Sequence, residues 1–222
     1  MAMRRRRTRQ FAVIGLGRFG SSVASTLYKQ GQEVLAIDNV EDRVQEMAPH
    51  VTHAVQADAT DEQAMRAIGI RNFDVVIVAI GEIEASILAT SVVKGLGVRY
   101  VVAKALSDLH GRVLERVGAD RVVYPERDMG VRVAHNLLSG NIIDYIELMP
   151  GYSIVEVTAK EGFIGRTLRE LDFRAKYGIT VLAIRRGTEV IVAPNPDTTI
   201  EKEDVLVAMG EDERLEELEA LP

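Results

Sequence analysis

Residues 11–20 read FAVIGLGRFG, an apolar strand-like run that passes directly into a glycine-rich turn. The turn has the form G-x-G-x-x-G, and its glycines are Gly15, Gly17 and Gly20. The first glycine permits a tight turn, the second lets a pyrophosphate approach the backbone, and the third lets the next helix pack closely on the strand. The free N–H groups at the start of that helix hold an anion without a basic side chain. This segment therefore predicts a nucleotide-binding crevice.

Alternating strand-like and helical stretches continue from Phe11 to Glu126. Short runs rich in β-branched residues separate amphipathic segments, which is typical of a parallel sheet covered by helices on both faces. The predicted strands are 11–15, 33–38, 52–58, 75–81, 100–105 and 121–126, and the predicted helices begin at Arg18 and cover 40–47, 62–68, 84–95 and 109–117. The fold class is therefore α/β, with a Rossmann-like doubly wound parallel sheet.

The alternation changes after Pro125. Residues 128–138 predict one helix with an apolar face that is able to bury against another subunit. That face consists of Met129, Val133, Leu137 and Leu138. Residues 141–150 predict a second short helix and a hinge, closed by the turn dipeptide Pro150-Gly151.

The remaining residues predict a small α+β module. Its strands are expected at 152–159, 180–185, 189–192 and 204–209, and its helices at 167–176 and 211–221. Gly178 is placed to take the left-handed cap after the first of these helices. The predicted organisation is a basic leader (1–9), a nucleotide-binding domain (10–126), a crossover helix and hinge (127–150) and a small regulatory domain (151–222).

Acidic residues end the second and third predicted strands. Asp38 follows the glycine motif at about the 20-residue distance at which a carboxylate accepts hydrogen bonds from ribose hydroxyls. An ordinary carboxylate cap is the alternative for Asp38. Asp58, followed by Ala59 and Thr60, is expected near the adenine end of the same crevice, or else as the N-cap of the next helix.

The variable positions of the glycine motif include Arg18 and Phe19. The backbone already serves the phosphates of a dinucleotide, so a guanidinium at Arg18 favours an additional phosphate. A bidentate contact of this kind distinguishes a triphosphate from a diphosphate by about 1.5–3 kcal/mol. A plain surface arginine at the helix start is the alternative.

Composition and missing motifs exclude several classes of protein. The chain has no cysteine, which excludes disulfides, thiolate metal sites and cysteine nucleophiles. The four histidines form no cluster and no hydrolase or P-loop motif occurs, so the sequence offers no catalytic residue. The longest apolar run, 75–80, is too short to cross a bilayer. A net charge of −6 argues against nucleic acid as a partner and leaves the arginines at 4–7 as a solvated tail.

Several sequence segments, taken in their order along the chain, resemble those of a known family. FAVIGLGRFG, EVLAID, GIRNFDVVIVAIG and GADRVVYPERDMGVRVA resemble the KtrA-type regulatory RCK subunits of Ktr and Trk potassium uptake systems. YSIVEV, LDFRAKYGITVLAIRRG and VLVAMG continue the likeness, which extends from Gln10 to Gly210. The resemblance is specific because an arginine lies inside the glycine motif and because the N-terminal and C-terminal segments occur in the same order.

The resemblance implies a cytoplasmic, non-enzymatic subunit that controls ion flux. It implies RCK N-terminal and C-terminal domains in a homo-oligomer, with dimers assembled into an octameric ring under a KtrB-like membrane subunit that holds the pore. ATP or ADP is expected at Gly15, Gly17 and Gly20, with Asp38 on the ribose and Arg18 on the terminal phosphate, either within one subunit or across the dimer interface.

Two further ligands are implied by the resemblance. A divalent cation, Mg²⁺ or Ca²⁺, is expected near Glu126 between nucleotide domains, and both ions prefer oxygen ligands. The alternative is a helix-start glutamate favoured by the helix dipole. Some relatives bind cyclic di-AMP at positions that match Leu171 and Arg174. The leader is more basic than the family pattern requires.

Two rival functions stay open at this point. An NAD-dependent oxidoreductase using NAD or NADH is favoured by the glycines and Asp38 but has no acid–base group to support it. A redox- or nucleotide-sensing DNA regulator needs a basic recognition face, and the only basic cluster is the leader.

Overall fold

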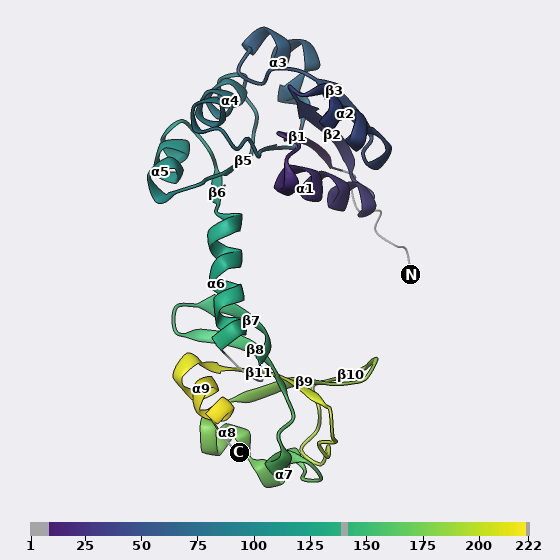
Figure 1. The fold of residues 1–222 in the computed structure, drawn as a ribbon, viewed down its shortest axis with the longest axis vertical. Helices are drawn as coiled ribbons and strands as arrows, with labels where there is room; N and C mark the ends of the chain where they lie inside the picture. The colour runs from purple at the N-terminus through teal and green to yellow at the C-terminus, as the bar shows by residue number, and fades with distance from the viewer. Residues whose placement is uncertain (1–8, 139–141, 221–222) are drawn as a thin grey trace. The chain divides into compact units, whose positions relative to one another are not determined.

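The computed structural model describes residues 9–138 and 142–220 (Figure 1). Contacts within the chain divide it into two compact units, Met1–Glu126 and Arg127–Pro222. The arginines at 4–7 of the predicted leader lie outside the described residues. The glycine motif belongs wholly to the first unit.

The first unit is built on a six-stranded parallel sheet with the strand order β3-β2-β1-β4-β5-β6. This is the strand order of the Rossmann fold, so the predicted fold class is confirmed. The strands are β1 (Gln10–Ile14), β2 (Glu33–Asp38), β3 (His53–Gln56), β4 (Val75–Val78), β5 (Val101–Lys104) and β6 (Arg121–Val123). The helices are α1 (Arg18–Lys29), α2 (Glu41–Met47), α3 (Glu62–Ile68), α4 (Ile83–Gly95) and α5 (Asp108–Arg116), with 3-10 turns η1 (Ala48–His50) and η2 (Ile70–Asn72).

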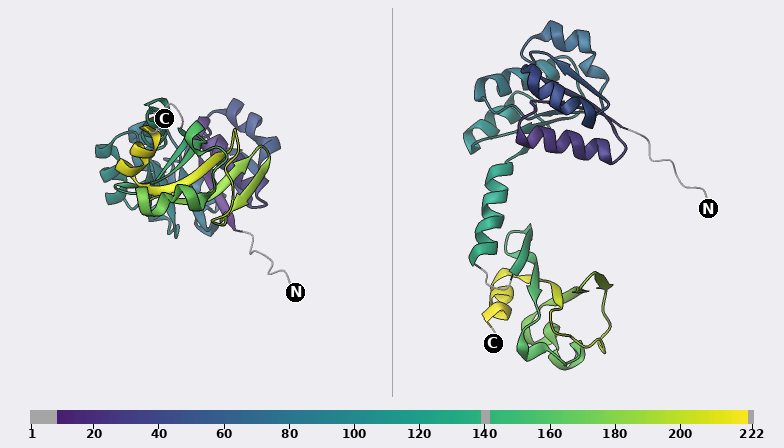
Figure 2. Two further views of the ribbon diagram at one scale, coloured as in Figure 1. Left: turned by 90° about the horizontal axis from the view of Figure 1, so that it is seen from below. Right: turned by 45° about the vertical axis from the view of Figure 1, so that its right-hand side comes forward.

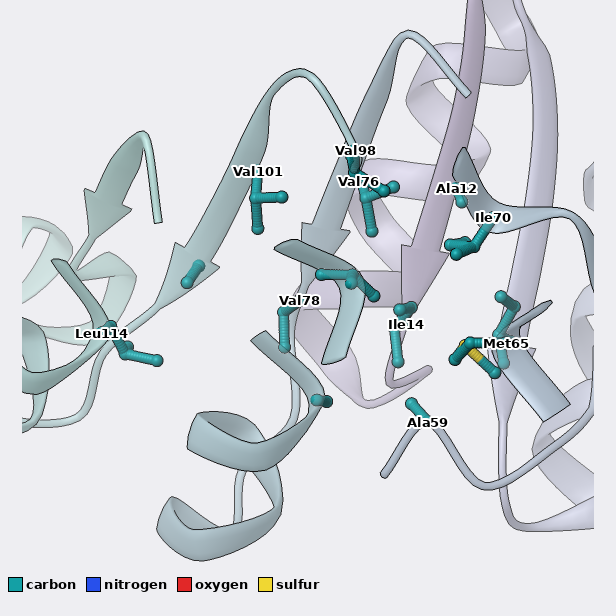
Figure 3. Close-up of a cluster of buried hydrophobic side chains, with 14 of the residues drawn as sticks. Ala12, Ile14, Ala59, Met65, Ile70, Val76, Val78, Val98, Val101 and Leu114 are labelled. Atoms are coloured by element: carbon teal, nitrogen blue, oxygen red, sulfur yellow. The ribbon is translucent and has the colours of Figure 1, made fainter. Parts of the chain in front are cut away.

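Alternate residues of the strands pack against helices on opposite faces of this sheet. Ala12 and Ile14 of β1 lie in one buried cluster with Met65 of α3 (Figure 3). Val13, between them, lies in a second cluster with Ala24 of α1. Successive side chains of a strand point to opposite faces, so both faces of the sheet are covered (Figure 2). This explains why the strands are nearly continuous runs of apolar residues.

The reversal of strand order at β1 fixes where a ligand is able to bind. β1 pairs with β2 on one side and with β4 on the other. The connections from these strands therefore run to opposite sides and leave a crevice beyond their carboxyl ends. The glycine motif begins at this point, because Gly15 directly follows β1.

The second unit contains an antiparallel five-stranded sheet with the order β10-β9-β11-β8-β7. The helix α6 (Pro125–Leu138) starts at the end of the first unit and continues into the second. The other elements are β7 (Ile142–Met149), β8 (Tyr152–Thr158), η3 (Glu161–Phe163), α7 (Leu168–Leu171), α8 (Phe173–Tyr177), β9 (Thr180–Arg186), β10 (Glu189–Val192), β11 (Val205–Glu211) and α9 (Asp212–Ala220).

The prediction of a short helix and a hinge over 141–150 is wrong where the structure describes that segment. β7 covers most of it and pairs antiparallel with β8. Met149 lies opposite Tyr152, so the predicted turn is the tight connection of a β-hairpin. Gly151 there has a φ of +84°, a conformation that residues with a side chain rarely adopt. Long-range pairing with β8 thus outweighs the local sequence pattern.

The predicted single helix over 167–176 is two short helices, α7 and α8. The break falls at Asp172, whose φ is +47°. Leu171 and Phe173, on either side of it, are both only 4% exposed and lie in the same core. A continuous helix would turn residues two apart to opposite sides, so the break allows both to be buried. The left-handed cap predicted at Gly178 is confirmed by its φ of +69°.

The helix predicted over 128–138 is α6, and it begins earlier than predicted, at Pro125. Proline is well suited to a first helical position because its fixed φ is helical and its missing N–H would have no partner there. Met129, Val133 and Leu137 of the predicted apolar face are 53%, 47% and 81% exposed. Within the described part of the chain, this face is therefore not buried.

Candidate functional site

A cleft of about 350 Å³ lies at the carboxyl ends of the parallel strands of the first unit. Its size falls within the usual range of small-ligand pockets, about 300–1,000 Å³. The structure brings most of the predicted site residues together around it: Gly15, Gly17, Arg18, Phe19, Asp38, Asp58, Ala59, Thr60 and Glu126. Gly20 is buried beneath the turn and does not line the cleft.

The glycine turn is held by close backbone contacts. Gly15 has a φ of +91°, and its N–H donates to the carbonyl oxygen of Ile37 at 2.8 Å. A Cβ atom at Gly15 would lie 2.9 Å from the carbonyl carbon of Ala79. A Cβ atom at Gly20 would lie 1.8 Å from the carbonyl oxygen of Gly15. Two of the three glycines are therefore required by the geometry of the chain itself.

The remaining glycine of the motif, Gly17, is the N-cap of α1. It offers no side chain to the first amides of the helix, and the first turn contains no acidic residue. A Cβ atom at Gly17 would meet no atom within 4 Å, so this position is open. The helix N-terminus at the cleft thus has no carboxylate of its own, which suits it to an anionic ligand.

Asp38 ends β2 and holds the glycine turn with its side chain. Its Oδ2 accepts a hydrogen bond from the N–H of Leu16 at 2.6 Å, and its Oδ1 accepts one from the N–H of Val40 at 2.9 Å. The carboxylate is buried, and Arg43 Nη1 lies 3.5 Å from Oδ2. Asp38 therefore both shapes the glycine turn and borders the cleft. Sequence reasoning missed Arg43, which lies in the first turn of α2 and also lines the cleft.

Asp58 stabilises a tight turn rather than a helix. Its Oδ1 accepts hydrogen bonds from the N–H of Thr60 at 2.9 Å and from Thr60 Oγ1 at 2.7 Å. These two bonds, the backbone one first, lower the pKa of the Asp58 carboxyl. The alternative that Asp58 is the N-cap of the next helix is wrong, because Asp61 caps α3 by accepting from Gln63 N and Ala64 N. The turn holds residues 58–60 against the cleft.

Glu126 lies in the first turn of α6, so the prediction that it ends a strand is wrong and the alternative of a helix-start glutamate is confirmed. Its Oε1 is 2.5 Å from the Nζ atom of Lys104, the last residue of β5. This hydrogen bond is the main cause of a lowered pKa of Glu126. The Lys104 ammonium also lies 6.0 Å from the centroid of the Phe19 ring. Sequence reasoning missed Lys104, although its place at the carboxyl end of a predicted parallel strand was a usable signal.

Arg18, the first residue of α1, is exposed and lines the cleft. No hydrogen bond or ion pair joins its guanidinium to another described residue of the chain. This distinguishes it from Arg43 and Lys104, whose charges are already paired with carboxylates. Its charge is available to a ligand of the cleft.

The described residues offer neither a metal cluster nor a catalytic histidine at the cleft. They contain no group of three or more His, Cys, Asp or Glu side chains that is suited to a metal ion. His110 is buried on α5, where burial lowers its pKa and the negative charge of Glu82 opposes that shift. Its Nδ1 accepts from Leu106 N at 3.3 Å. None of the described histidines lines the cleft.

The two residues expected to contact cyclic di-AMP lie in the second unit. Leu171 belongs to the core beneath α7, whereas Arg174 on α8 is exposed. The guanidinium of Arg174 is thus accessible to a phosphate, and the side chain of Leu171 is not accessible within this unit. Among the described helices, none is long and apolar enough to span a bilayer.

Comparison with known proteins agrees with both units. A family model described as the TrkA-N domain matches residues 11–125, and one described as the TrkA-C domain matches residues 152–222. The chain is 52% identical over 203 residues to the Ktr system potassium uptake protein C of Bacillus subtilis (strain 168), covering 91% of this chain and 92% of that one. It is 46% identical over 209 residues to the Ktr system potassium uptake protein A of the same organism, covering 94% of each chain.

A solved structure described as the GsuK channel bound to NAD shares the fold. Its TM-score is 0.53 at 24% sequence identity, over 95% of this chain and 38% of that one. The likeness in sequence to the two Ktr proteins spans nearly the full length of each, and the match to the TrkA-N domain includes the glycine motif. The predicted family is thereby confirmed: the chain belongs to the TrkA-N/TrkA-C family, among the regulatory subunits of Ktr potassium uptake systems.

Proposed function

We propose that the chain binds ATP and ADP in the cleft of the first unit and so controls potassium flux through a separate, KtrB-like membrane subunit. The observation that carries this proposal is Arg18, an exposed guanidinium without a partner among the described residues at the phosphate-binding turn. The turn and the helix N-terminus serve the phosphates nearer the ribose. A guanidinium beside them supplies a contact for one phosphate more.

Regulation follows from the difference between the two nucleotides. A ligand shifts a conformational equilibrium only by the difference between its affinities for the two states. The γ-phosphate of ATP adds a contact to Arg18 that ADP lacks, so ATP favours the state in which that contact is made. None of the described histidines lines the cleft, and its carboxylates already accept hydrogen bonds from backbone amides, a threonine or a lysine. In this proposal the protein acts as a sensor rather than as an enzyme.

The assembly proposed for this sensor is a homo-oligomer, with dimers joined in an octameric ring on the cytoplasmic side of the membrane. The exposed apolar residues of α6 support contact between subunits, because large apolar side chains gain free energy when buried. Glu126 takes part in a divalent-cation site only if a second chain or the nucleotide supplies further ligands, since one chain provides no acidic cluster among the described residues. Phosphate oxygens beside Glu126 suit Mg²⁺ or Ca²⁺.

A direct binding titration tests the proposed ligand. Purified protein is titrated with ATP, ADP, NADH and cyclic di-AMP in a calorimeter, and we expect ATP and ADP to bind the first unit. Tight NADH binding with turnover would instead establish an oxidoreductase. Cyclic di-AMP is proposed as a second ligand of the C-terminal unit, and loss of its binding in Arg174→Ala would support the exposed guanidinium as its contact. No binding of any adenine nucleotide would overturn the proposal.

Replacing Arg18 by alanine is expected to remove the preference for ATP over ADP. A charge-assisted hydrogen bond contributes about 1.5–3 kcal/mol, so ATP affinity should fall about 10- to 100-fold while ADP affinity changes little. Calorimetry with both nucleotides measures this. Arg66→Ala is the matched control, because Arg66 is an exposed arginine on α3 that pairs with Glu62 away from the cleft. If Arg18→Ala weakened ATP and ADP equally, the guanidinium would not read the terminal phosphate.

A further inference from the structure

The charges that line the cleft include a lysine that the glycine motif does not require. Arg18, Arg43 and Lys104 face three carboxylates, those of Asp38, Asp58 and Glu126. The cleft wall is therefore close to neutral in formal charge, although its proposed ligand carries several negative charges. A nucleotide phosphate entering it must find a cation whose existing partner is exchangeable.

Lys104 is the buried member of an unequal pair. Its side chain is 11% exposed, whereas the side chain of Glu126 is 64% exposed. A buried ammonium needs a partner, because removing it from water without one is costly. The partner is the solvent-exposed carboxylate of Glu126. If this carboxylate loses its contact with Lys104, water hydrogen-bonds to it instead. The Lys104 ammonium is thus held in place by β5, and the Glu126 carboxylate is the partner that another anion is able to replace.

The position of Lys104 relates it to the phosphate-binding turn. Its Nζ atom lies 6.0 Å from the centroid of Phe19, the second residue of α1. That helix presents its free N-terminal amides to the cleft, which Lys104 also lines. A phosphate held at the start of α1 would therefore lie close to the Lys104 ammonium. It would compete with the Glu126 carboxylate for the three N–H donors of that ammonium.

Glu126 connects this competition to the rest of the chain. It is the last residue of the first unit and stands in the first turn of α6, which continues into the second unit. We propose that Lys104 is shared between Glu126 and the phosphates of the bound nucleotide, so that nucleotide binding loosens the ion pair that fastens the start of α6 to β5. Lys104 then positions α6 according to the charge in the cleft. This inference rests on the proposed function, namely nucleotide binding in the same cleft.

Affinity measurements test whether Lys104 meets the phosphates. ATP and the uncharged ligand adenosine are titrated in EDTA, at constant ionic strength, against wild type and Lys104→Met. We expect Lys104→Met to weaken ATP about tenfold and adenosine about twofold or less, since one charge-assisted bond is lost. Lys94→Met is the matched control: Lys94 pairs with Asp120 at 2.9 Å, its side chain is 24% exposed, and it lies outside the cleft lining. Equal losses for ATP and adenosine would overturn the proposal.

Hydrogen exchange tests whether nucleotide binding is coupled to the stability of the start of α6. A lysine with a merely structural role would not make this exchange depend on ATP. ATP, but not adenosine, is expected to speed exchange of the amides of residues 129–132 in wild type, because these N–H groups donate to the carbonyl groups of the first turn of α6. In Lys104→Met the fastening is already absent, so ATP should no longer change that exchange; Lys104→Arg should retain part of the response. A response to ATP that persists in Lys104→Met would overturn the proposal. If wild type binds no ATP at all, the proposed function fails as well, and the two failures are thereby distinguished.

Discussion

Replacing Gly20 by alanine is expected to abolish nucleotide binding and to destabilise the first unit. The added Cβ atom would lie 1.8 Å from the carbonyl oxygen of Gly15 and 3.0 Å from its carbonyl carbon. Both neighbours are backbone atoms at the end of β1, so a change of side-chain rotamer cannot relieve the overlap. Overpacking in well-packed interiors usually costs about 1–3 kcal/mol, and we expect about 3 kcal/mol or more here because the backbone itself must move. Calorimetry with ATP and thermal unfolding measure the two effects.

Gly17→Ala separates stability from binding in this experiment. Gly17 belongs to the same motif, but a Cβ atom there would meet no atom within 4 Å and the backbone φ is −69°, which alanine adopts readily. We expect thermal unfolding close to that of wild type and weaker ATP binding, because this glycine lines the cleft where a phosphate is proposed to approach the backbone. A Gly20→Ala variant with wild-type stability and affinity would show that the strand and helix separate easily, contrary to the packing described.

The first unit could be predicted from sequence because its signals are local. Gly15 and Gly20 must be glycine for reasons of backbone geometry that the motif spacing already encodes. Asp38 ends a strand whose apolar run predicted its bounds, Glu33–Asp38, without error. A parallel strand that is covered on both faces is a continuous run of apolar residues. This pattern is recognised in the sequence without knowledge of the strand that pairs with it.

The parts that sequence reasoning missed depend on contacts between distant residues. β7 is a strand because β8 pairs with it, and the segment's own pattern resembles a short helix. The break at Asp172 follows from the burial of Leu171 and Phe173 in one core, which no local propensity records. Lys104 and Glu126 come from β5 and α6, and their contact at 2.5 Å becomes visible only when these elements meet at the cleft.

Replacing Asp38 by asparagine is expected to lower the affinity for ATP and ADP alike by about 10- to 100-fold. The two carboxylate oxygens accept hydrogen bonds from the backbone N–H groups of Leu16 and Val40. Asparagine has one acceptor oxygen and one NH₂ group, so one of these N–H donors would face another donor in a buried position. Hydrogen bonds to charged groups contribute about 1.5–3 kcal/mol, and loss of either one releases the glycine turn or the start of α2. Calorimetric titration measures the affinity.

Asp120→Asn is the matched control for this variant. Asp120 also accepts a hydrogen bond from a backbone N–H, that of Val101 at 2.7 Å, but it does not line the cleft. We expect Asp120→Asn to lower the thermal stability and to leave nucleotide affinity unchanged. If both variants lost affinity equally, the effect at Asp38 would be a general consequence of disturbing the sheet.

A second comparison separates two roles of Asp38, holding the turn and contacting the ribose. The ligand 2′-deoxy-ATP lacks the ribose 2′-hydroxyl, which donates a hydrogen bond to a carboxylate at this position in related folds. If Asp38 contacts the ribose, wild type should bind 2′-deoxy-ATP more weakly than ATP, and Asp38→Asn should bind the two more nearly alike. If Asp38 only holds Leu16 in the turn, the variant should lose the same factor for both ligands, because the two effects are then independent and add in free energy. The buried carboxylate holds the turn through its hydrogen bond from Leu16 N. A ribose contact is therefore measured as the coupling free energy between the Asp38→Asn change and the loss of the 2′-hydroxyl.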